Sequence, residues 1–298
     1  MQKDEFYRDA RTDLTGPLAG VRVLEVTTTW AGPMCAAVLA DLGATVIKVE
    51  IPTGDVGRAL SPQLPGTEVS FAHATVNRNK QALALDIRQP EGRKICLDLA
   101  CESDIMIENF KVGTMQRYGL GYDEIRAVKP DIVYVSITGW GQFGPRHEGA
   151  GYDPLAQAAS GFMSVNGSPE TPPTKAGTFL ADDLGGLHGA IGAMAALRHR
   201  DQTGEGQHVD IALLDSMLFQ CNGLLTLGAM GIAPGRSGNE FGFAVPANLF
   251  ECKDGPVYVG ILLDAHWAVL TQVLGQPDLA DNPAFATREA RAANRDVC

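Results

Sequence analysis

Long apolar runs, aromatic side chains and paired cysteines are all scarce in this chain of 298 residues. No segment approaches the roughly twenty apolar residues of a membrane-spanning helix, and the longest candidate, residues 223–233, is interrupted by glycines. The opening stretch MQKDEFYRDARTD carries charges of both signs and no apolar segment, which is not the pattern of a secretory signal. The six cysteines include no CxxC pair. These absences favour a reducing, cytoplasmic compartment and argue against a disulfide scaffold.

Positive charge is also in short supply, with 24 basic against 35 acidic residues and a net charge of −11. An acidic protein repels nucleic acid and anionic membranes unless it gathers its positive charge locally. We therefore expect small-molecule substrates as partners, with no nucleic acid and no membrane.

Strand and helix patterns alternate through the first two thirds of the chain. Strands are predicted at residues 20–26, 44–50, 104–108, 131–137 and 206–212. Helices are predicted at residues 33–42, 90–102, 115–128, 183–200 and 213–230. This alternation with short connections predicts an α/β fold with right-handed crossovers and a mostly parallel sheet. Ligands of such sheets bind at the carboxyl ends of the strands, so the loops that follow the strands are the ones to examine.

The composition and the pattern of predicted elements change after the last of these helices. A glycine-dense loop, a strand at 256–261 and a helix at 265–274 follow Pro234. We place a large α/β domain at residues 1–221 and the start of a smaller domain at residues 222–298. The predicted helix 183–200 contains four glycines, each of which costs a helix about 1 kcal/mol relative to alanine. Their presence predicts close approach of another backbone or of a ligand.

The sequence lacks the best-known nucleotide and hydrolase motifs. A glutamate ends the second strand, as in NAD-binding folds, but residues 27–34 read TTTWAGPM and contain no G-x-G-x-x-G. A P-loop, an HExxH motif and a GxSxG motif are absent as well. We therefore expect neither NAD nor a metal.

Eight short sequence segments, taken together, indicate a different class of protein. In chain order they are VLEVTTTWAGP, LADLGATVIKVE, NRNKQALALD, SDIMIENFKVG, YGLGYDEI, GYDPLAQAASG, ADDLGGLHGAIGAMAAL and TGEGQHVDIALLDS. They resemble the family III CoA-transferases of the CaiB/BaiF type, which includes formyl-CoA transferase and carnitine CoA-transferase. The resemblance runs from about Gly16 to about Asn294. It implies a Rossmann-like large domain, a smaller second domain and an interlocked homodimer, with coenzyme A or acyl-CoA as substrate and no metal. Relatives usually continue beyond the equivalent of Cys298 and return to the large domain, a segment absent from this sequence.

The resemblance assigns the catalytic role to one aspartate, Asp182. In the family this residue attacks the acyl-CoA thioester to give an aspartyl anhydride, and CoA then forms an aspartyl-CoA thioester that the acceptor acid attacks. An aspartate just ahead of a helix can also simply cap it, and the helix dipole favours its ionised form. Asp183, its neighbour, is the fallback nucleophile and the better candidate for the cap.

The resemblance also implies residues that contact substrate. Those matched to CoA contacts are Thr29, Lys80, Asn109, Phe110, Arg117 and Tyr152. Trp30 is a candidate for the wall of the substrate pocket or, equally, a core residue. Gly238 lies in the glycine-rich stretch 236–242, which either shields the substrate pocket, as in some relatives, or is a plain interdomain loop. Arg78 and Lys111 are either CoA contacts or ordinary surface charges. Many relatives carry an arginine after the glutamate of the second strand, where this chain has Ile51, and Arg58 is the candidate replacement.

Two alternatives stay open. The family includes acyl-CoA racemases, which use a histidine–aspartate pair, but here Tyr152 stands in place of that histidine, and tyrosine, with a pKa near 10, is a poor base at neutral pH. His147 lies outside the motif and is interpreted as a surface residue. The other alternative is a non-catalytic CoA-binding fragment.

Overall fold

The computed structural model describes residues 2–9 and 15–298. The chain divides into two compact units, the first formed by residues 1–160 and 177–222 and the second by residues 161–176 and 223–298. Residues 161–176, which the sequence analysis assigned to the first domain, thus group with the C-terminal part of the chain.

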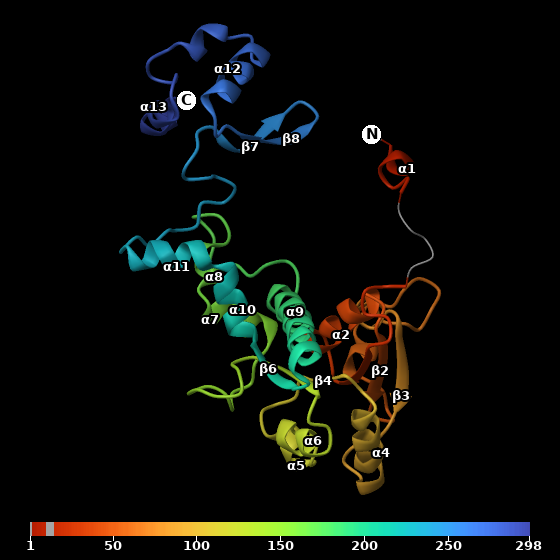
Figure 1. Cartoon of the computed structure of the whole chain (residues 1–298). Coiled ribbons are helices and arrows are strands. Elements are labelled where there is room, and N and C mark those ends of the chain that lie inside the picture. The colour runs from red at the N-terminus through yellow and green to blue at the C-terminus, as the bar shows by residue number, and fades with distance from the viewer. Residues whose placement is uncertain (1, 10–14) are drawn as a thin grey trace. The chain divides into compact units, whose positions relative to one another are not determined.

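The first unit is built on a six-stranded sheet in which every pair of neighbouring strands is parallel (Figure 1). Its strands are β1 (Arg22–Val26), β2 (Thr45–Glu50), β3 (Lys80–Ala84), β4 (Ile105–Glu108), β5 (Val133–Thr138) and β6 (Gln207–Ala212). They lie in the order β3-β2-β1-β4-β5-β6, the arrangement of doubly wound dinucleotide-binding folds. The predicted mostly parallel sheet is therefore confirmed. Strand β3 was not predicted, because none of its residues is fully buried and it lacks an apolar run.

Helices cover both faces of this sheet. In the first unit they are α1 (Lys3–Phe6), α2 (Ala31–Asp41), η1 (Val56–Ala59), α3 (Phe71–Val76), α4 (Pro90–Cys101), α5 (Thr114–Arg117), α6 (Tyr122–Val128), α7 (Asp153–Ala159), α9 (Leu180–Thr203) and α10 (Leu213–Gln220). Side chains of α4, α5 and α6 pack on one face against Leu24, Met106 and Tyr134. Helices α2 and α9 pack on the other face, where Gly189 meets Cys35 and Ile137.

Two predicted long helices are each interrupted. The predicted helix 115–128 is split into α5 and α6 because Gly119 adopts a φ of +68° between them. The predicted helix 213–230 is split at Cys221 into α10 and α11 (Asn222–Ala229). Sequence periodicity did not reveal either break.

The second unit has its own small core. Besides α11, its elements are α8 (Phe162–Val165), the antiparallel hairpin of β7 (Ala247–Cys252) and β8 (Gly255–Gly260), α12 (Asp264–Val273), η2 (Pro277–Ala280), α13 (Arg288–Ala293) and η3 (Arg295–Val297). Arg291 is fully buried and holds these elements together by donating to the carbonyl of Val245 at 2.7 Å, to the carbonyl of Phe285 at 2.9 Å and to Asp264 Oδ1 at 2.9 Å. A buried guanidinium is tolerated because its donors are satisfied in this way.

No helix in the described part of the chain is long and apolar enough to cross a membrane. All six cysteines are free thiols, and Cys35, Cys96 and Cys221 are buried. The predicted compartment stays a prediction.

Glycines of α9 allow it to pack directly against α2. A Cβ atom added to Gly186 would lie 2.9 Å from the carbonyl oxygen of Ala31 and 2.9 Å from Met34 Cβ. A Cβ atom at Gly189 would lie 3.0 Å from Cys35 Sγ. The close backbone approach predicted from the glycines of this helix is therefore confirmed, and the partner is α2.

We expect Gly186→Ala to lower the free energy of unfolding by about 1–3 kcal/mol, because α9 must move away from a backbone carbonyl that cannot yield. Gly228→Ala in α11 is the matched control, because a Cβ atom there meets nothing within 4 Å. The control should be neutral or stabilising by up to about 1 kcal/mol. Urea unfolding measures both, and equal effects of the two substitutions would contradict the packing interpretation.

Candidate active site

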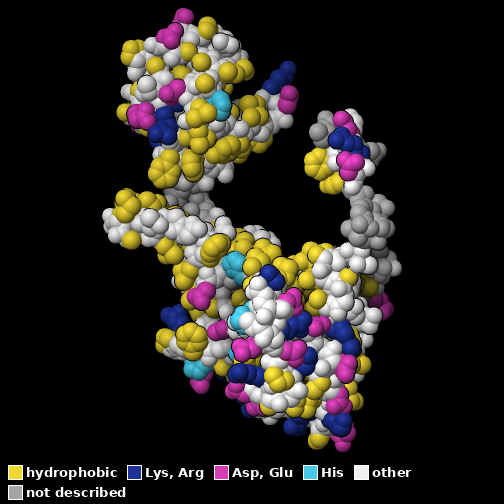
Figure 2. Space-filling model, in the orientation of Figure 1, with side chains coloured by type: hydrophobic (Ala, Val, Ile, Leu, Met, Phe, Trp, Pro, Cys, Tyr) yellow, Lys and Arg dark blue, Asp and Glu magenta, His cyan; other side chains and the backbone are white. Residues whose placement is uncertain are grey.

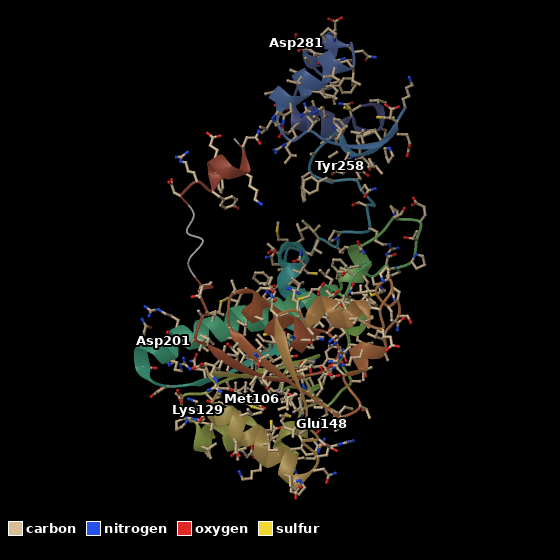
Figure 3. All side chains as sticks on the ribbon, turned by 90° about the vertical axis from the view of Figure 1, so that its right-hand side faces the viewer. Met106, Lys129, Glu148, Asp201, Tyr258 and Asp281 are labelled. Atoms are coloured by element: carbon tan, nitrogen blue, oxygen red, sulfur yellow. The ribbon has the colours of Figure 1, made fainter. Side chains whose placement is uncertain are left out.

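A cavity of about 330 Å³ opens at the carboxyl ends of the central strands. The strand order reverses between β1 and β4, and in open parallel sheets this crevice is where ligands bind. The loops after β1, β4 and β5 line the cavity together with the start of α9 and of α10. In Figure 3, Glu148, from the loop after β5, lies at one end of the sheet, and Lys129 and Asp201 lie toward the other end.

The loops after β1 and β4 are tied together by one amide side chain. Asn109 Oδ1 accepts from the backbone N–H of Thr28 at 2.9 Å, and Asn109 Nδ2 donates to the carbonyl of Thr28 at 2.8 Å. A Cβ atom at Gly32 would lie 2.6 Å from Thr27 Cγ2 and 2.9 Å from Asn109 Cγ. Asn109, predicted as a CoA contact, therefore lines the cavity with its side-chain amide already committed to holding the cavity wall.

Thr29, on the same wall, has a strained backbone. Its φ is +70°, a left-handed conformation that a β-branched residue adopts only when its surroundings impose it. Thr29 was predicted to contact CoA, and the structure places it on the cavity.

Asp182 lies in the first turn of α9 and lines the cavity. The sequence analysis started this helix at Asp183 and put Asp182 ahead of it, which is wrong by three residues. The N-cap position is Phe179, and the free N–H of Ala181 is bonded instead by Asp153 Oδ1 of α7 at 2.7 Å. Neither Asp182 nor Asp183 is therefore needed as the cap.

The Asp182 carboxylate makes no hydrogen bond or ion pair within the described part of the chain. Burial, with additional contributions from the negative charges of Asp153 and Asp183, raises the pKa of Asp182 to about 7. The helix dipole was expected to favour the ionised form of Asp182. Its contribution of only about 0.3–1 kcal/mol is outweighed by the loss of hydration and by the two nearby negative charges. At neutral pH the carboxylate is poised between its two forms.

Asp183 points to a different partner. Its Oδ1 accepts a hydrogen bond of 2.7 Å from the indole Nε1 of Trp30. Trp30 is 7% exposed, lines the cavity and packs on Phe179 and Phe71 with centroid separations of 4.4 and 6.3 Å. The two adjacent aspartates therefore have different surroundings: Asp183 orients the aromatic wall, and Asp182 is left free beside the cavity.

The remaining predicted residues divide into two groups. Phe110 and Tyr152 line the cavity, whereas Lys80, Arg117 and Gly238 do not. Arg117 is exposed and donates to Thr114 Oγ1 at 3.0 Å. Gly238 belongs to the second unit, where its N–H donates to the carbonyl of Gly167 at 2.9 Å.

Lys80 is turned into the protein interior. Its side chain is 2% exposed and its ammonium group contacts Glu25 Oε2 at 2.7 Å and the carbonyl of Pro33 at 2.7 Å. Burial, reinforced by the neighbouring charge of Lys48 and opposed by Glu25, lowers the pKa of Lys80 to about 8. Arg78 is likewise paired, with Asp41. Neither side chain is directed at the cavity.

His147, interpreted from the sequence as a surface histidine, has a side chain that is 37% exposed and that also lines the cavity of Asp182, as does Lys111. The loop returns to the cavity because its ends meet, since a Cβ atom on Gly139 would lie 2.3 Å from the Cα atom of Gly151. His147 Nδ1 donates to the carbonyl of Gly144 at 2.7 Å, and Nε2 lies 3.9 Å from Glu148 Oε1. The paired glycines were the only sequence signal for this closure.

A second, more apolar cavity of about 280 Å³ adjoins the first, and Thr28 and Phe110 line both. Glu50 and Ile51 line it at the end of β2. Burial alone would raise the pKa of Glu50, but hydrogen bonds from Arg58 and from the N–H of Asp55 outweigh it and lower the pKa to about 2. Arg58 therefore lies close to the position where relatives are expected to carry an arginine, but it grips Glu50 through two hydrogen bonds of 2.7 and 2.8 Å.

No cluster of three or more histidine, cysteine, aspartate or glutamate side chains suited to a metal is found among residues 2–9 and 15–298.

Comparison with known proteins gives a consistent picture. Residues 18–298 match the sequence model of CoA-transferase family III. The chain is 38% identical over 289 residues to the succinyl-CoA:mesaconate CoA-transferase of Haloarcula hispanica, covering 94% of this chain and 72% of that protein. It is 39% identical over 287 residues to the succinate–glutarate CoA-transferase of Agrobacterium fabrum, with coverage of 94% and 72%. The crystal structure of a CAIB/BAIF family protein from Brucella suis superposes with a TM-score of 0.85 at 38% identity, covering 95% of this chain and 76% of that one.

Proposed function

The chain belongs to CoA-transferase family III and is a CoA-transferase, and on that premise we propose that Asp182 is the residue through which it transfers CoA from an acyl-CoA donor to a free carboxylic acid. The observation that carries this assignment is a half-buried carboxylate that makes no hydrogen bond among the described residues and lines a cavity at the crevice of a doubly wound sheet. The two carboxylates beside it, Asp153 and Asp183, are each engaged in hydrogen bonds.

The transfer would proceed by acyl exchange on this carboxylate. One oxygen of Asp182 attacks the thioester carbonyl of the donor, the C–S bond breaks, and CoA leaves as its thiolate with an aspartyl–acyl anhydride left behind. The thiolate then attacks the aspartyl carbonyl, which releases the donor acid and leaves an aspartyl-CoA thioester. The acceptor carboxylate attacks this thioester, and the returning thiolate attacks the new acyl group and frees Asp182. Dividing one exchange between weak nucleophiles into four easier steps is the gain from covalent catalysis.

The surroundings of Asp182 favour the first step. An ionised carboxylate that is partly desolvated and lies near two other carboxylates is poorly stabilised. Acylation removes its charge and with it this unfavourable term, so part of the driving force for anhydride formation is stored in the folded protein. The raised pKa also makes the ionised group a better nucleophile than an ordinary surface aspartate.

The two adjoining cavities offer a path for CoA. The apolar second cavity suits the adenine ring, and Phe110, shared by both, suits the pantetheine arm that leads to Asp182. Thr29, Asn109 and Tyr152 lie along the first cavity and remain proposed CoA contacts. Lys111, and outside the cavities Arg117, supply positive charge for the phosphates, which an acidic protein must concentrate locally. Lys80 is set aside because its charge is matched by Glu25 in the interior.

The acyl group is proposed to be a dicarboxylic one. Both curated relatives named above act, by their names, on succinate or succinyl-CoA together with a second dicarboxylic acid. A distal carboxylate needs a cationic donor, and the cavity offers the imidazole of His147, which donates from Nε2 in its protonated form.

We expect His147→Gln to raise the KM for a dicarboxylic acid such as succinate about tenfold, because the lost charge-assisted hydrogen bond is worth on the order of 1.5 kcal/mol. The KM for a monocarboxylic acid of similar length, such as butyrate, should change less than about twofold, as it has no distal carboxylate. His266→Gln, at an exposed site of the second unit, is the matched control and should change neither value. Steady-state kinetics with the two acids decides, and equal effects on both would contradict a role in selecting dicarboxylic acids.

Exposed apolar side chains support the expected homodimer. Helix α11 has no buried residue although half of its sequence, NGLLTLGA, is strongly apolar, and Figure 2 shows these side chains on the surface. Phe219 on α10 is 65% exposed, and Phe250 and Tyr258 of the hairpin β7–β8 are exposed too. Surfaces of this kind mark protein–protein contacts.

Sedimentation velocity should give a dimer of about 63 kDa from the 31.6 kDa chain. A monomer at micromolar concentration would refute the homodimer.

Trapping tests the central assignment. Incubation with succinyl-CoA and hydroxylamine should leave a hydroxamate on the peptide that contains Asp182, detectable by mass spectrometry. Trapping at pH 8 should be about tenfold faster than at pH 6, because the nucleophile is protonated below a pKa of about 7. Asp182→Asn should abolish the hydroxamate.

Asp183→Asn is the matched control, with the same chemical change one residue along and an oxygen retained for Trp30. It should keep the hydroxamate. Modification at Asp183, or no modification with deuterium exchange at the α carbon of the acyl-CoA, would overturn the assignment, and the second result would indicate the racemase alternative.

A further inference from the structure

The strained conformation of Thr29 has a specific anchor. Oδ1 of Asp55 accepts from the N–H of Thr29 at 3.1 Å and from the hydroxyl of Thr28 at 3.4 Å. The same oxygen accepts from the N–H of Gly57 at 2.6 Å, as the N-cap of η1. One carboxylate oxygen thus binds both the loop after β1 and the turn after β2.

Asp55 is itself held from two sides. Its backbone N–H donates to Glu50 Oε2 at 2.9 Å, and Glu50 is gripped in turn by Arg58. Its other carboxylate oxygen, Oδ2, lies 3.2 Å from the ammonium group of Lys48. The carboxylate therefore has a fixed position relative to β2.

Lys48 connects Asp55 to a buried group of charges under the loop. Lys48 Nζ lies 2.8 Å from Glu25 Oε1 of β1, and Lys80 Nζ of β3 lies 2.7 Å from Glu25 Oε2. The side chains of Asp55, Lys48, Glu25 and Lys80 are each at most 2% exposed, and their charges sum to zero. Such a group keeps a defined geometry, because displacing one member leaves another buried and unpaired.

We infer that Asp55 is a positioning residue for CoA transfer: through its bond to the Thr29 N–H it holds the Thr28–Trp30 segment in the left-handed turn that forms the cavity wall beside Asp182. This inference rests on the proposed function of the cavity but not on which aspartate becomes acylated. Asp55 lines the second cavity but not the cavity of Asp182, so any effect that it has on the wall beside Asp182 passes through Thr29. An extended Thr29 would carry Thr28 and Trp30 to different positions and release the link to Asn109.

A double-mutant cycle between Asp55 and Thr29 tests this role. Asp55→Ala should lower kcat/KM for CoA transfer by roughly thirty-fold or more, mainly through kcat, because a misplaced wall misorients bound substrate. In a Thr29→Gly background the same change should cost only a few-fold, because glycine adopts a φ of +70° without an anchor. Asp55→Asn, which keeps an oxygen for the Thr29 N–H, should fall between wild type and Asp55→Ala.

Stability measurements separate positioning from folding. Asp55→Ala should lower the unfolding midpoint equally in both backgrounds, because Lys48 loses one of its two carboxylate partners whichever residue occupies position 29. Asp104→Ala is the matched control, since Asp104 also accepts from a backbone N–H, that of Arg22 at 2.8 Å, and pairs with a cation, Arg200, at the amino ends of the strands. It should lower the midpoint and leave kcat and KM unchanged.

Amide hydrogen exchange gives a readout that does not depend on activity. The Thr29 N–H should be protected in the wild type and in Asp55→Asn, and should exchange much faster in Asp55→Ala. Equal losses of kcat/KM in the two backgrounds, or protection of Thr29 unchanged by Asp55→Ala, would overturn the positioning role. A failure of hydroxamate trapping at Asp182 would leave both results intact, so the two hypotheses fail separately.

Discussion

The direct contact between α2 and α9 is the constraint on which the rest of the site depends. Because Gly186 has no side chain, the first turns of α9 can lie against the carbonyl of Ala31 at the start of α2. That contact sets the carboxylate of Asp182 beside the loop after β1, over the crevice where the strand order reverses. A single Cβ atom at this contact would move Asp182, the proposed nucleophile, away from the cavity wall, so packing in the fold and geometry at the site depend on the same contact.

The carboxylates in and near the core of the first unit are of two kinds, those paired with lysines and one that is unpaired. Glu25 and Asp55 are matched by Lys48 and Lys80, and the resulting neutral group fixes strands and loop. Asp182, at the cavity, forms no ion pair with any described residue. Neutralised charges give rigidity, whereas the unmatched charge gives reactivity, because a carboxylate that is poorly stabilised when ionised gains most from forming a covalent bond. The buried charge group thus fixes the cavity wall, and the carboxylate of Asp182 supplies the proposed reactivity beside it.

Local patterns were good predictors where burial imposed them. The strands β1, β2, β4 and β5 were predicted because their residues form apolar runs that a parallel sheet buries. The edge strand β6 was also predicted, although only Ala212 in it is buried. Strand β3 was missed because it is partly exposed and, unlike β6, contains no β-branched residue. The breaks at Gly119 and Cys221 were missed because they leave the apolar periodicity of the helices intact. The sequence analysis placed residues 161–176 in the first domain, whereas their contacts group them with the later part of the chain, because no local sequence pattern records contacts between distant segments.

The sequence by itself determined the fold class and the family resemblance, and it supplied Asp182 as the candidate nucleophile, because these depend on residue types and on their order along the chain. The tertiary structure decided what each residue does. It turned Lys80 inward toward Glu25, gave Asp183 to Trp30, and brought His147 to the cavity through the closure of Gly139 on Gly151. It also raised the pKa of Asp182, where helix position alone suggested the reverse. The physical reason is the same in each case: desolvation and charge pairing depend on neighbours that are distant in sequence, and only folding brings them together.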